Sequence, residues 1–466
     1  MLWLRVDPLW PLRLGWVLLG GLLAAGQEFT ALDRYVQAPD PSFRFELVNT
    51  IPGDGITTYV LDMVSQNWLT KAEVDRTEWR HWLTVIKPEK VSTSVGLLLI
   101  SGGTNGGKPP SGPNLILWTI AQETGAVTAE LRMVPNQPLT FAGDGQARRE
   151  DALIAYTWDR YMRTGDEKWP ARLPMTKAAV RAMDAVTAFA KSPAGGGVSV
   201  EKFVVAGGSK RGWTTWTAAA VDKRVIAATP MVIDVLNNEK ALVHHWRAYG
   251  FWAPALKDYT DMRTMDWTGT RQLGALMAIE DPFAYRDRLT MPKYLVNSAG
   301  DEFFPLDSSQ FYFADLPGEK YLRYVPNSDH SLKDSDVPFS LLAYFQSIVT
   351  CTPRPRFYWT ADRDQGVVRL RTIDPPSQVL LWQAANPKAR DFRLVSIGKA
   401  WTSSPVTGDH GLYVASMPKP EQGWKAFFLE LTYPSGGKYP FKFTTEVVVT
   451  PNAYPFPAPR PIPESR

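Results

Sequence analysis

Residues 203–213 read Phe-Val-Val-Ala-Gly-Gly-Ser-Lys-Arg-Gly-Trp, and no other stretch of the chain is as informative about its fold. The stretch begins as a buried strand, passes through two glycines to Ser209, and continues as a helix. A nucleophile elbow needs this order, because its serine lies on a strained strand-to-helix turn that only small neighbours accommodate. The usual pattern is G-x-S-x-G, whereas here Arg211 stands at the second glycine and Gly212 follows it. The alternative is a glycine turn whose serine caps the helix.

Strand-like and helical patterns alternate around this elbow from about residue 43 to residue 350. Such alternation predicts βαβ units and a mostly parallel sheet with helices on both faces. Together with the elbow, it indicates an α/β-hydrolase fold over residues 27–351. The expected strands cover residues 95–100, 203–206, 227–233, 294–297 and 321–325, and the expected helices include 177–191 and 212–221.

The alternation stops between residues 237 and 290. This segment is rich in aromatic residues and has no strand signal. We expect a helical insertion that lies as a lid over the carboxyl edge of the sheet, where α/β sheets bind ligands. A packed helical layer without a role in a pocket is the alternative.

The pattern changes after Cys351, where residues 352–355 resemble a linker. Short alternating runs separated by turn signals then predict a small antiparallel β-sandwich over residues 352–452. Residues 453–466 are rich in proline and are expected to form an extended tail. Cys351 closes an apolar stretch, so we expect its side chain to be buried. The runs cover residues 368–371, 379–382, 392–395, 412–415, 424–431 and 441–449.

The first 26 residues have the layout of a signal peptide. Arg5 and Arg13 flank a short positive region, an apolar run covers residues 14–23, and small residues lead to Gly26. The run is short for a transmembrane helix, so cleavage after Gly26 would leave no membrane segment. We therefore predict export to the periplasm or the extracellular space, with an uncleaved membrane anchor as the alternative.

The bulk composition excludes several classes of protein. Of the 466 residues, 44% are hydrophobic and 21% are charged, a balance typical of globular rather than disordered chains. The net charge of +4 and the lack of a long Lys/Arg cluster give no reason to expect nucleic acid as a partner. No H-E-x-x-H pattern, dinucleotide fingerprint or phosphate loop occurs, so we expect neither a metal nor a cofactor.

A serine nucleophile needs a base, and the chain has only five histidines. His81 comes too early in the chain, His244 and His245 fall in the predicted insertion, and His410 lies in the predicted sandwich. His330 follows the strand expected at residues 321–325, which is where the triad histidine of an α/β-hydrolase lies. We therefore expect His330 to be the base.

The acid that orients the base should follow the strand expected at residues 294–297. Asp301 stands there, and Ser209, Asp301 and His330 occur in the order that this fold uses. Glu302 is the adjacent competitor, and Asp234, at the end of an earlier strand, is a second. Asp329 is interpreted as a loop carboxylate beside the base.

The groups that would bind the reacting oxygen and the substrate can also be predicted. The backbone N–H of Lys210 is the expected first donor of an oxyanion hole, and Gly102 and Gly103, after the strand at residues 95–100, are expected to supply the second. These two glycines could equally form a plain turn. Arg211 and Trp213 are the predicted substrate contacts, since a guanidinium near the site could recognise a carboxylate. The alternative for Lys210 and Arg211 is a solvated pair on the first turn of the helix.

Taken together, these segments resemble the PhoPQ-activated pathogenicity-related protein family, which includes the autocrine proliferation repressor proteins. The resemblance implies an exported α/β-hydrolase-like domain followed by a smaller β domain, and it makes Arg211 normal within the S-K-R-G-W pattern. It does not settle the reaction. The elbow is also similar to the G-C-S-R-x-G of glucuronoyl esterases, with Gly208 in place of the cysteine. The matching stretches are residues 65–68, 100–105, 134–139, 149–151, 154–158, 208–216 and 232–237.

The function predicted from the sequence is that of an exported serine hydrolase. Its substrate would be a small-molecule, saccharide or peptide ester, and an aminopeptidase-like activity is less favoured. The alternative is a non-catalytic secreted protein that signals or binds on a hydrolase scaffold, because fold does not imply function. A third hypothesis assigns carbohydrate binding to Trp382, Trp401 or Trp424 of the sandwich, although tryptophans of this kind usually belong to a core.

Overall fold

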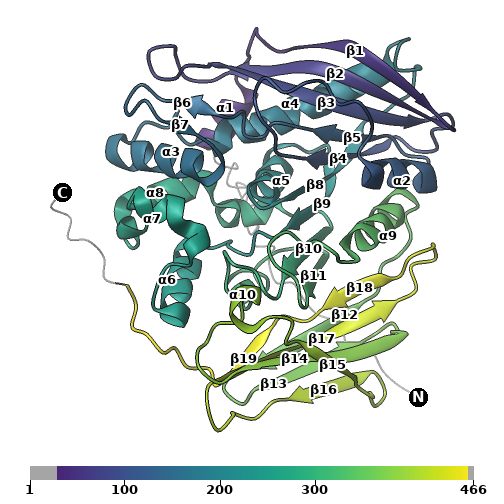
Figure 1. Ribbon diagram of the computed structural model, residues 1–466. Coiled ribbons are helices and arrows are strands. Elements are labelled where there is room, and N and C mark those ends of the chain that lie inside the picture. The colour runs from purple at the N-terminus through teal and green to yellow at the C-terminus, as the bar shows by residue number, and fades with distance from the viewer. Residues whose placement is uncertain (1–28, 460–466) are drawn as a thin grey trace, which may run out of the picture.

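The structure is a computed structural model that describes residues 29–459. Within these residues, 14 strands form one long sheet in the order β1-β2-β3-β5-β4-β8-β9-β10-β11-β18-β17-β14-β15, and β19 pairs with β17 (Figure 1). The predicted signal peptide, residues 1–26, lies outside the described residues.

The centre of the sheet consists of parallel strands that are buried on both faces. Side chains of a strand point alternately to its two faces, so strands of this kind are apolar throughout. In β8, Val204 and Ala206 pack on one face, while Phe203 and Val205 pack on the other. The parallel strands are β5 (Thr128–Leu131), β4 (Val95–Ile100), β8 (Lys202–Gly208), β9 (Val225–Met231), β10 (Lys293–Ser298) and β11 (Lys320–Val325).

Helices cover both faces of these strands. The helices α2 (Leu115–Thr124) and α9 (Val337–Val349) pack on one face, and α1 (Ala31–Gln37), α4 (Arg172–Lys191) and α5 (Lys210–Val221) pack on the other (Figure 1). A mostly parallel sheet between two helical layers, with Ser209 at the turn between β8 and α5, confirms the predicted α/β-hydrolase fold.

Antiparallel strands extend the sheet at its N-terminal edge. The chain adds β1 (Arg44–Gly53), β2 (Ile56–Asn67) and β3 (Glu78–Pro88), and β3 pairs antiparallel with β5. A small hairpin of β6 (Leu139–Thr140) and β7 (Ala147–Arg148) leads to α3 (Glu150–Thr164). This hairpin and α3 lie close to the elbow, as described below.

Between β9 and β10 the described chain forms helices and no strand. Two of its helices, α7 and α8, pack against α3. In Figure 1 the segment lies on the same side as α3, beside the carboxyl ends of the parallel strands. Its role as a lid stays a prediction. The elements are α6 (Asn238–Tyr249), η1 (Pro254–Leu256), α7 (Lys257–Asp261), η2 (Thr264–Trp267), α8 (Arg271–Glu280) and η3 (Pro282–Arg288), and η4 (Ser308–Phe311) follows β10.

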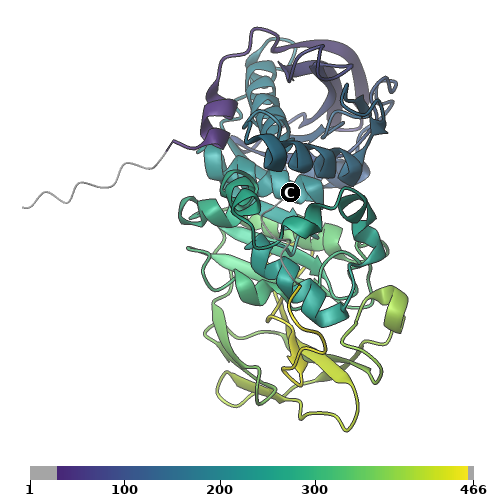
Figure 2. The same ribbon diagram turned by 90° about the vertical axis from the view of Figure 1, so that its left-hand side faces the viewer.

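The strands after residue 352 form the predicted small antiparallel sandwich. One layer continues the central sheet, because β18 pairs with β11 through Leu322 and Thr444. Figure 2 shows these strands at the opposite end of the molecule from the N-terminal strands. This layer contains β14 (Gln378–Asn386), β15 (Thr402–Pro405), β17 (Trp424–Tyr433), β18 (Phe441–Thr444) and β19 (Val448–Thr450), and the other contains β12 (Phe357–Asp362), β13 (Val367–Thr372) and β16 (Leu412–Ser416).

Two expectations for this region are wrong. Residues 392–395 form no strand but lead into the short helix α10 (Leu394–Ile397), because Asp391 accepts hydrogen bonds from the backbone and the guanidinium of Arg393. Cys351 is exposed rather than buried. It lies beyond the end of α9 with φ of 54°, so it has left the face that the helix buries.

The tryptophans considered for carbohydrate binding belong to the packing of the sandwich. Trp401 is 3% exposed, and Trp382 and Trp424 are half-buried against the same hydrophobic core. No helix between residues 29 and 459 is both long enough and apolar enough to span a bilayer.

Candidate active site

Ser209 lies on a strained turn between β8 and α5. Its φ of 56° and ψ of −124° are unusual for a residue with a side chain. Strain of this kind persists only where the surrounding structure imposes it, and it is a property of nucleophile elbows. The backbone N–H of Ser209 donates to Met231 O at 2.9 Å, and Trp213 N–H donates to Ser209 O at 3.0 Å, so both sides of the turn are anchored.

The glycines around Ser209 are not equivalent. A Cβ at Gly207 would lie 2.6 Å from the carbonyl oxygen of Arg211, and one at Gly212 would lie 2.8 Å from that of Met231. A Cβ at Gly208 would meet nothing closer than 3.8 Å. The elbow therefore needs glycine at 207 and at 212, which explains why Arg211 is compatible with it.

His330 lies in the loop after β11, and its ring is held by Asp301 from the loop after β10. Its Nδ1 lies 2.8 Å from Oδ2 of Asp301, and its backbone N–H donates to Glu302 Oε2 at 2.9 Å. Asp301 is thus the carboxylate on the ring, and Glu302 fixes the backbone of the same loop. Asp329 bonds to Ser331 within this loop.

The surroundings of His330 favour its protonated form. Burial would lower the pKa of His330, but the Asp301 carboxylate, by its charge and its hydrogen bond, and the charge of Glu302 raise the pKa above 6.5. Phe303 and Phe304 pack on the ring, with centroid distances of 4.4 and 6.0 Å. The Nε2 atom is buried and has no hydrogen-bond partner among residues 29–459.

Asp234, the other acid candidate, is engaged elsewhere. Its two carboxylate oxygens accept hydrogen bonds from Tyr312 at 2.6 Å and from Tyr324 at 2.5 Å. Burial raises the pKa of Asp234 to about 7, although both hydrogen bonds lower it. No hydrogen bond joins Asp234 to the His330 ring within residues 29–459, where the ring is held by Asp301.

Of the two glycines after β4, Gly102 contacts the elbow, because the side chain of Arg211 packs on it. A Cβ at Gly102 would lie 2.5 Å from Nη2 of Arg211, so the guanidinium packs on the bare backbone there. Gly103 has φ of 148° and packs against Met133. Its N–H donates to no acceptor in the described part of the chain. Their role in an oxyanion hole, with the N–H of Lys210, stays a prediction.

Lys210 and Arg211 tie the elbow to the start of α3. Both guanidinium Nη atoms of Arg211 donate to Glu150, at 2.8 and 2.6 Å, and its Nε donates to Val134 O. Lys210 Nζ donates to Asp151 at 2.8 Å. Lys210 is buried and Arg211 is partly buried, and both are paired rather than solvated. Recognition of a substrate carboxylate by Arg211 stays a prediction, and Glu150 occupies its Nη atoms in this structure.

A small cavity of about 60 Å³ lies beside Ser209. Trp213, predicted to contact substrate, lies in its wall, and so do Phe303 and Phe304, which cover His330. Residues of the helical segment after β9 also line it. The remaining lining residues are Asp151, Trp158, Arg172, Lys210, Ile233, Asp234, Val235, Asn238, Ala241, Leu242, His245, Leu256, Tyr259, Met265, Pro305 and Ser308.

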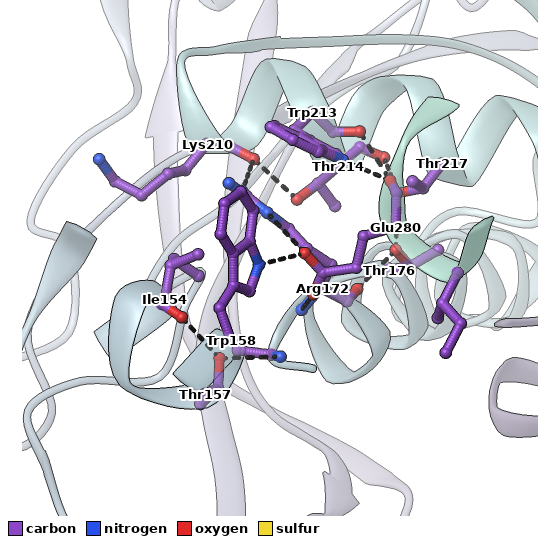
Figure 3. A network of polar contacts seen from close by, with 12 residues as sticks. Ile154, Thr157, Trp158, Arg172, Thr176, Lys210, Trp213, Thr214, Thr217 and Glu280 are labelled. Carbon is purple, nitrogen blue, oxygen red and sulfur yellow. Dashed lines mark hydrogen bonds and ion pairs between the residues drawn. The ribbon is translucent and has the colours of Figure 1, made fainter. Parts of the chain in front are cut away.

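A polar network lies behind this cavity (Figure 3). The Trp213 indole donates to the backbone oxygen of Glu280 at 2.6 Å, and the Trp158 indole donates to the carboxylate of Glu280 at 2.5 Å. The guanidinium of Arg172 lies over the Trp213 ring, 4.3 Å from its centroid. Burial raises the pKa of Glu280 to about 7, although Arg172 and the Trp158 hydrogen bond lower it.

Sequence reasoning missed several of these residues. Arg172 and Glu280 lie inside apolar helical patterns and form no motif, so nothing in the sequence marks them. Phe303 and Phe304 directly follow the acidic pair at 301–302, and that position was a usable signal. No group of three or more His, Cys, Asp or Glu side chains within residues 29–459 is arranged to hold a metal ion.

Comparison with known proteins gives a family and several structural relatives. The family model described as PhoPQ-activated pathogenicity-related protein matches residues 32–393. Autocrine proliferation repressor protein A of Dictyostelium discoideum is 40% identical over 463 residues, which cover 93% of each chain. Among solved structures, acetyl xylan esterase 1 from Thermoanaerobacterium is 16% identical with a TM-score of 0.45, covering 64% of this chain and 86% of its own. A glucuronoyl esterase from Solibacter usitatus is 13% identical with a TM-score of 0.41, covering 69% and 90%.

Proposed function

The chain belongs to the PhoPQ-activated pathogenicity-related protein family, and on this premise we propose that it is an exported serine hydrolase that cleaves an ester bond. A peptide bond is a less favoured target. One observation carries the proposal: a histidine whose Nδ1 is held by Asp301 at 2.8 Å, and whose Nε2 has no partner among the described residues, accompanies a serine on a strained strand-to-helix turn. An oriented base and a serine on such a turn are two parts of nucleophilic catalysis by serine, and a hydrogen bond from Ser209 Oγ to His330 Nε2 is the part that the proposal adds.

The first half of the reaction would acylate Ser209. His330 Nε2 takes the proton from Ser209 Oγ as Oγ bonds to the acyl carbon, and the carbonyl oxygen becomes an oxyanion. The N–H groups of Lys210 and of Gly103 or Gly102 would stabilise that oxyanion. His330 then passes the proton to the alcohol oxygen as the carbon–oxygen bond breaks, and the alcohol leaves.

The second half would release the acid. His330 takes a proton from a water molecule, whose oxygen bonds to the acyl carbon, and then returns that proton to Ser209 Oγ as the ester to the enzyme breaks. The carboxylate of Asp301 holds Nδ1 of the ring, which leaves Nε2 free to act as the base, and it would stabilise the imidazolium formed in each half. The pKa of His330, raised by this same carboxylate, reflects that stabilisation.

Export is the second part of the proposal. It rests on the signal-peptide layout of residues 1–26 in the sequence. We infer that the mature chain acts on small-molecule, saccharide or peptide esters outside the cytoplasm. Cleavage after Gly26, read by mass spectrometry of the exported chain, is the expected result, and an intact N-terminus on the exported protein would contradict it.

Labelling with a fluorophosphonate tests the catalytic proposal, because this probe reacts with activated serines. We expect labelling of the wild-type chain and its loss in Ser209→Ala. Ser331→Ala is the matched control, since Ser331 hydroxyl bonds to Asp329 in an exposed loop, and it should keep the label. A folded wild-type protein that stays unlabelled would overturn the proposal.

A second candidate function is signalling without catalysis. The observation in its favour is the name of the 40% identical relative, a repressor of autocrine proliferation. If the chain acts as a secreted signal in the same way, its effect on cell proliferation should survive Ser209→Ala. An effect that disappears with the Ser209 hydroxyl would assign the activity to hydrolysis.

A further inference from the structure

Arg172 is a buried cation in the wall of the cavity beside Ser209. It stands at the first position of α4, its side chain is 2% exposed, and it lines the cavity with Lys210 and Trp213. Figure 3 shows Arg172 beside Trp213, and its guanidinium lies over that indole, 4.3 Å from the ring centroid. Charged side chains are almost never fully buried unless they are paired, so this position needs an explanation.

The hydrogen-bond donors of Arg172 are largely unused. A guanidinium has five N–H groups. Its Nη1 donates to Lys210 O at 3.1 Å. Its Nε is buried without a hydrogen-bond partner, and Nη2 has none either among residues 29–459. A buried guanidinium with unused donors is a costly arrangement unless a ligand completes it.

Glu280 is the ion-pair partner of Arg172, but within residues 29–459 no carboxylate accepts a hydrogen bond from its guanidinium. The carboxylate of Glu280 comes no closer than 4.0 Å, at Arg172 Nε, and its oxygens accept from the Trp158 indole and from the backbone N–H of Arg172. Burial also raises the pKa of Glu280 to about 7, although Arg172 lowers it, so Glu280 is only partly charged near neutral pH. Asp151, the other carboxylate nearby, is bonded to Lys210 and Tyr259.

The size and lining of the cavity restrict which ligand can accept hydrogen bonds from Arg172. A volume of about 60 Å³ is well below the roughly 150 Å³ that holds benzene, so only a group of a few atoms fits. Most of the wall is apolar, with Ile233, Leu242 and Leu256 among its members. A short apolar spacer that ends in a small anion matches such a wall.

We propose that Arg172 binds a carboxylate at the far end of the substrate's acyl group, so that the substrate is a half-ester of a short dicarboxylic acid. This rests on the proposed hydrolysis at Ser209. The acyl group stays bonded to Ser209 between the two halves of the reaction, so a small cavity beside this serine suits the acyl group better than the departing alcohol. Arginine is also the residue that matches the planar geometry of a carboxylate.

Two chromogenic esters of equal chain length test the proposal with the full chain. We expect kcat/KM for 4-nitrophenyl hemisuccinate to exceed that for 4-nitrophenyl butyrate at least tenfold, because only the first carries the carboxylate. Arg172→Gln should remove this preference. Arg181→Gln, in the same helix but bonded to Asp184 and outside the cavity, should keep it. A wild-type preference for butyrate, or an unchanged ratio in Arg172→Gln, would overturn the proposal.

Binding measurements separate this proposal from that of hydrolysis. Calorimetry with Ser209→Ala should show binding of succinate and none of the neutral succinamide, whether or not the wild-type chain is catalytic. If Arg172→Gln does not fold, Arg172→Lys is the second variant, because it keeps the charge but lacks the planar guanidinium. It should weaken the binding of succinate at least tenfold. Equal binding of succinate and succinamide would refute the carboxylate site. Absence of fluorophosphonate labelling would refute the proposed hydrolysis but not the carboxylate site.

Discussion

Contacts of single atoms define which residues the elbow tolerates. Ser209 adopts a strained backbone because β8 turns into α5 without a loop. A Cβ at Gly207 would meet the backbone of α5, and one at Gly212 would meet that of β9. Position 211 carries a side chain, whose guanidinium packs on Gly102. Compared with G-x-S-x-G, the second glycine is therefore shifted by one residue, from 211 to 212, and the elbow is kept.

Two alanine substitutions test this distinction. Gly212→Ala should lower the free energy of unfolding by about 1 to 3 kcal/mol, because its Cβ would lie 2.8 Å from a backbone oxygen. Gly208→Ala is the matched control and should change it by less than about 1 kcal/mol, since its Cβ meets nothing within 3.8 Å. Urea unfolding measures both, and equal losses in the two variants would contradict the geometry.

The protonation of His330 predicts how the rate depends on pH. The base must be neutral, and its pKa is raised above 6.5, so kcat/KM for a neutral ester should rise with pH and reach half its plateau above pH 6.5. In Asp301→Asn the carboxylate that raises the pKa is lost while burial, which lowers it, remains. The midpoint should therefore fall, and the plateau rate should drop by about 10⁴-fold.

The measurement is a pH–rate profile for each protein with 4-nitrophenyl butyrate. Asp329→Asn is the control, because Asp329 bonds within its own loop and not to the imidazole. A midpoint that is unchanged or higher in Asp301→Asn would show that Asp301 does not set the pKa of His330.

At the scale of residues, the polar candidates that follow strands could be predicted from the sequence, whereas Arg172, at the start of a helix, could not. His330 and Asp301 could be predicted because the carboxyl ends of parallel strands meet at one edge of the sheet. Residues that directly follow such strands are therefore expected to lie near one another. Arg172 could not be located, because a single charge at the start of an apolar helix is usually exposed. Only the packing of α4 against α5, together with the contact with Glu280, shows that it is buried.

At the scale of elements, α6 connects the cavity with the C-terminal segment. Ala241, Leu242 and His245 on one side of α6 line the cavity. On another side, His244 Nδ1 lies 2.8 Å from the hydroxyl of Tyr454. The C-terminal segment thus packs against a wall of the proposed active site, and we expect it to restrain α6.

Tyr454→Phe tests this restraint. It leaves a buried nitrogen of His244 without its partner, which should cost about 1 to 3 kcal/mol and accelerate amide hydrogen exchange in α6. Tyr358→Phe, on an exposed part of β12, is the matched control and should leave exchange in α6 unchanged. Exchange in α6 that is the same in both variants would exclude a restraint by Tyr454.

The elements that the sequence predicts best are the buried parallel strands. The strand predicted at residues 95–100 coincides with β4, and the strand predicted at 294–297 lies within β10, because a short apolar run between turn residues has few alternatives. The run at 392–395 is also mostly apolar, apart from Arg393, but it forms no strand. There, the ion pair of Asp391 and Arg393 is buried and bends the chain into α10, a tertiary effect that periodicity does not contain.

At the scale of the whole molecule, the junction between β11 and β18 decides whether the chain unfolds in one step. Thr444 pairs with Leu322 and its hydroxyl accepts from the backbone of Tyr324 at 3.0 Å. Phe443 stacks on Tyr321 with a centroid distance of 4.2 Å. The domain boundary predicted at residue 351 rests on a change in the hydrophobic pattern of the sequence. Such a change does not reveal that one sheet continues across the boundary.

A sheet that is shared in this way should unfold cooperatively. We expect a single calorimetric transition for the full chain, because separating the two parts would expose the aromatic side chains of β11 and β18. Phe443→Ala, which removes a buried ring between these strands, should lower the midpoint of that whole transition, at a cost of about 3 to 5 kcal/mol. Phe339→Ala is the matched control, since its ring is 45% exposed and should have a small effect. Two separate transitions, of which Phe443→Ala shifts only one, would instead establish residues 352–452 as an independent domain.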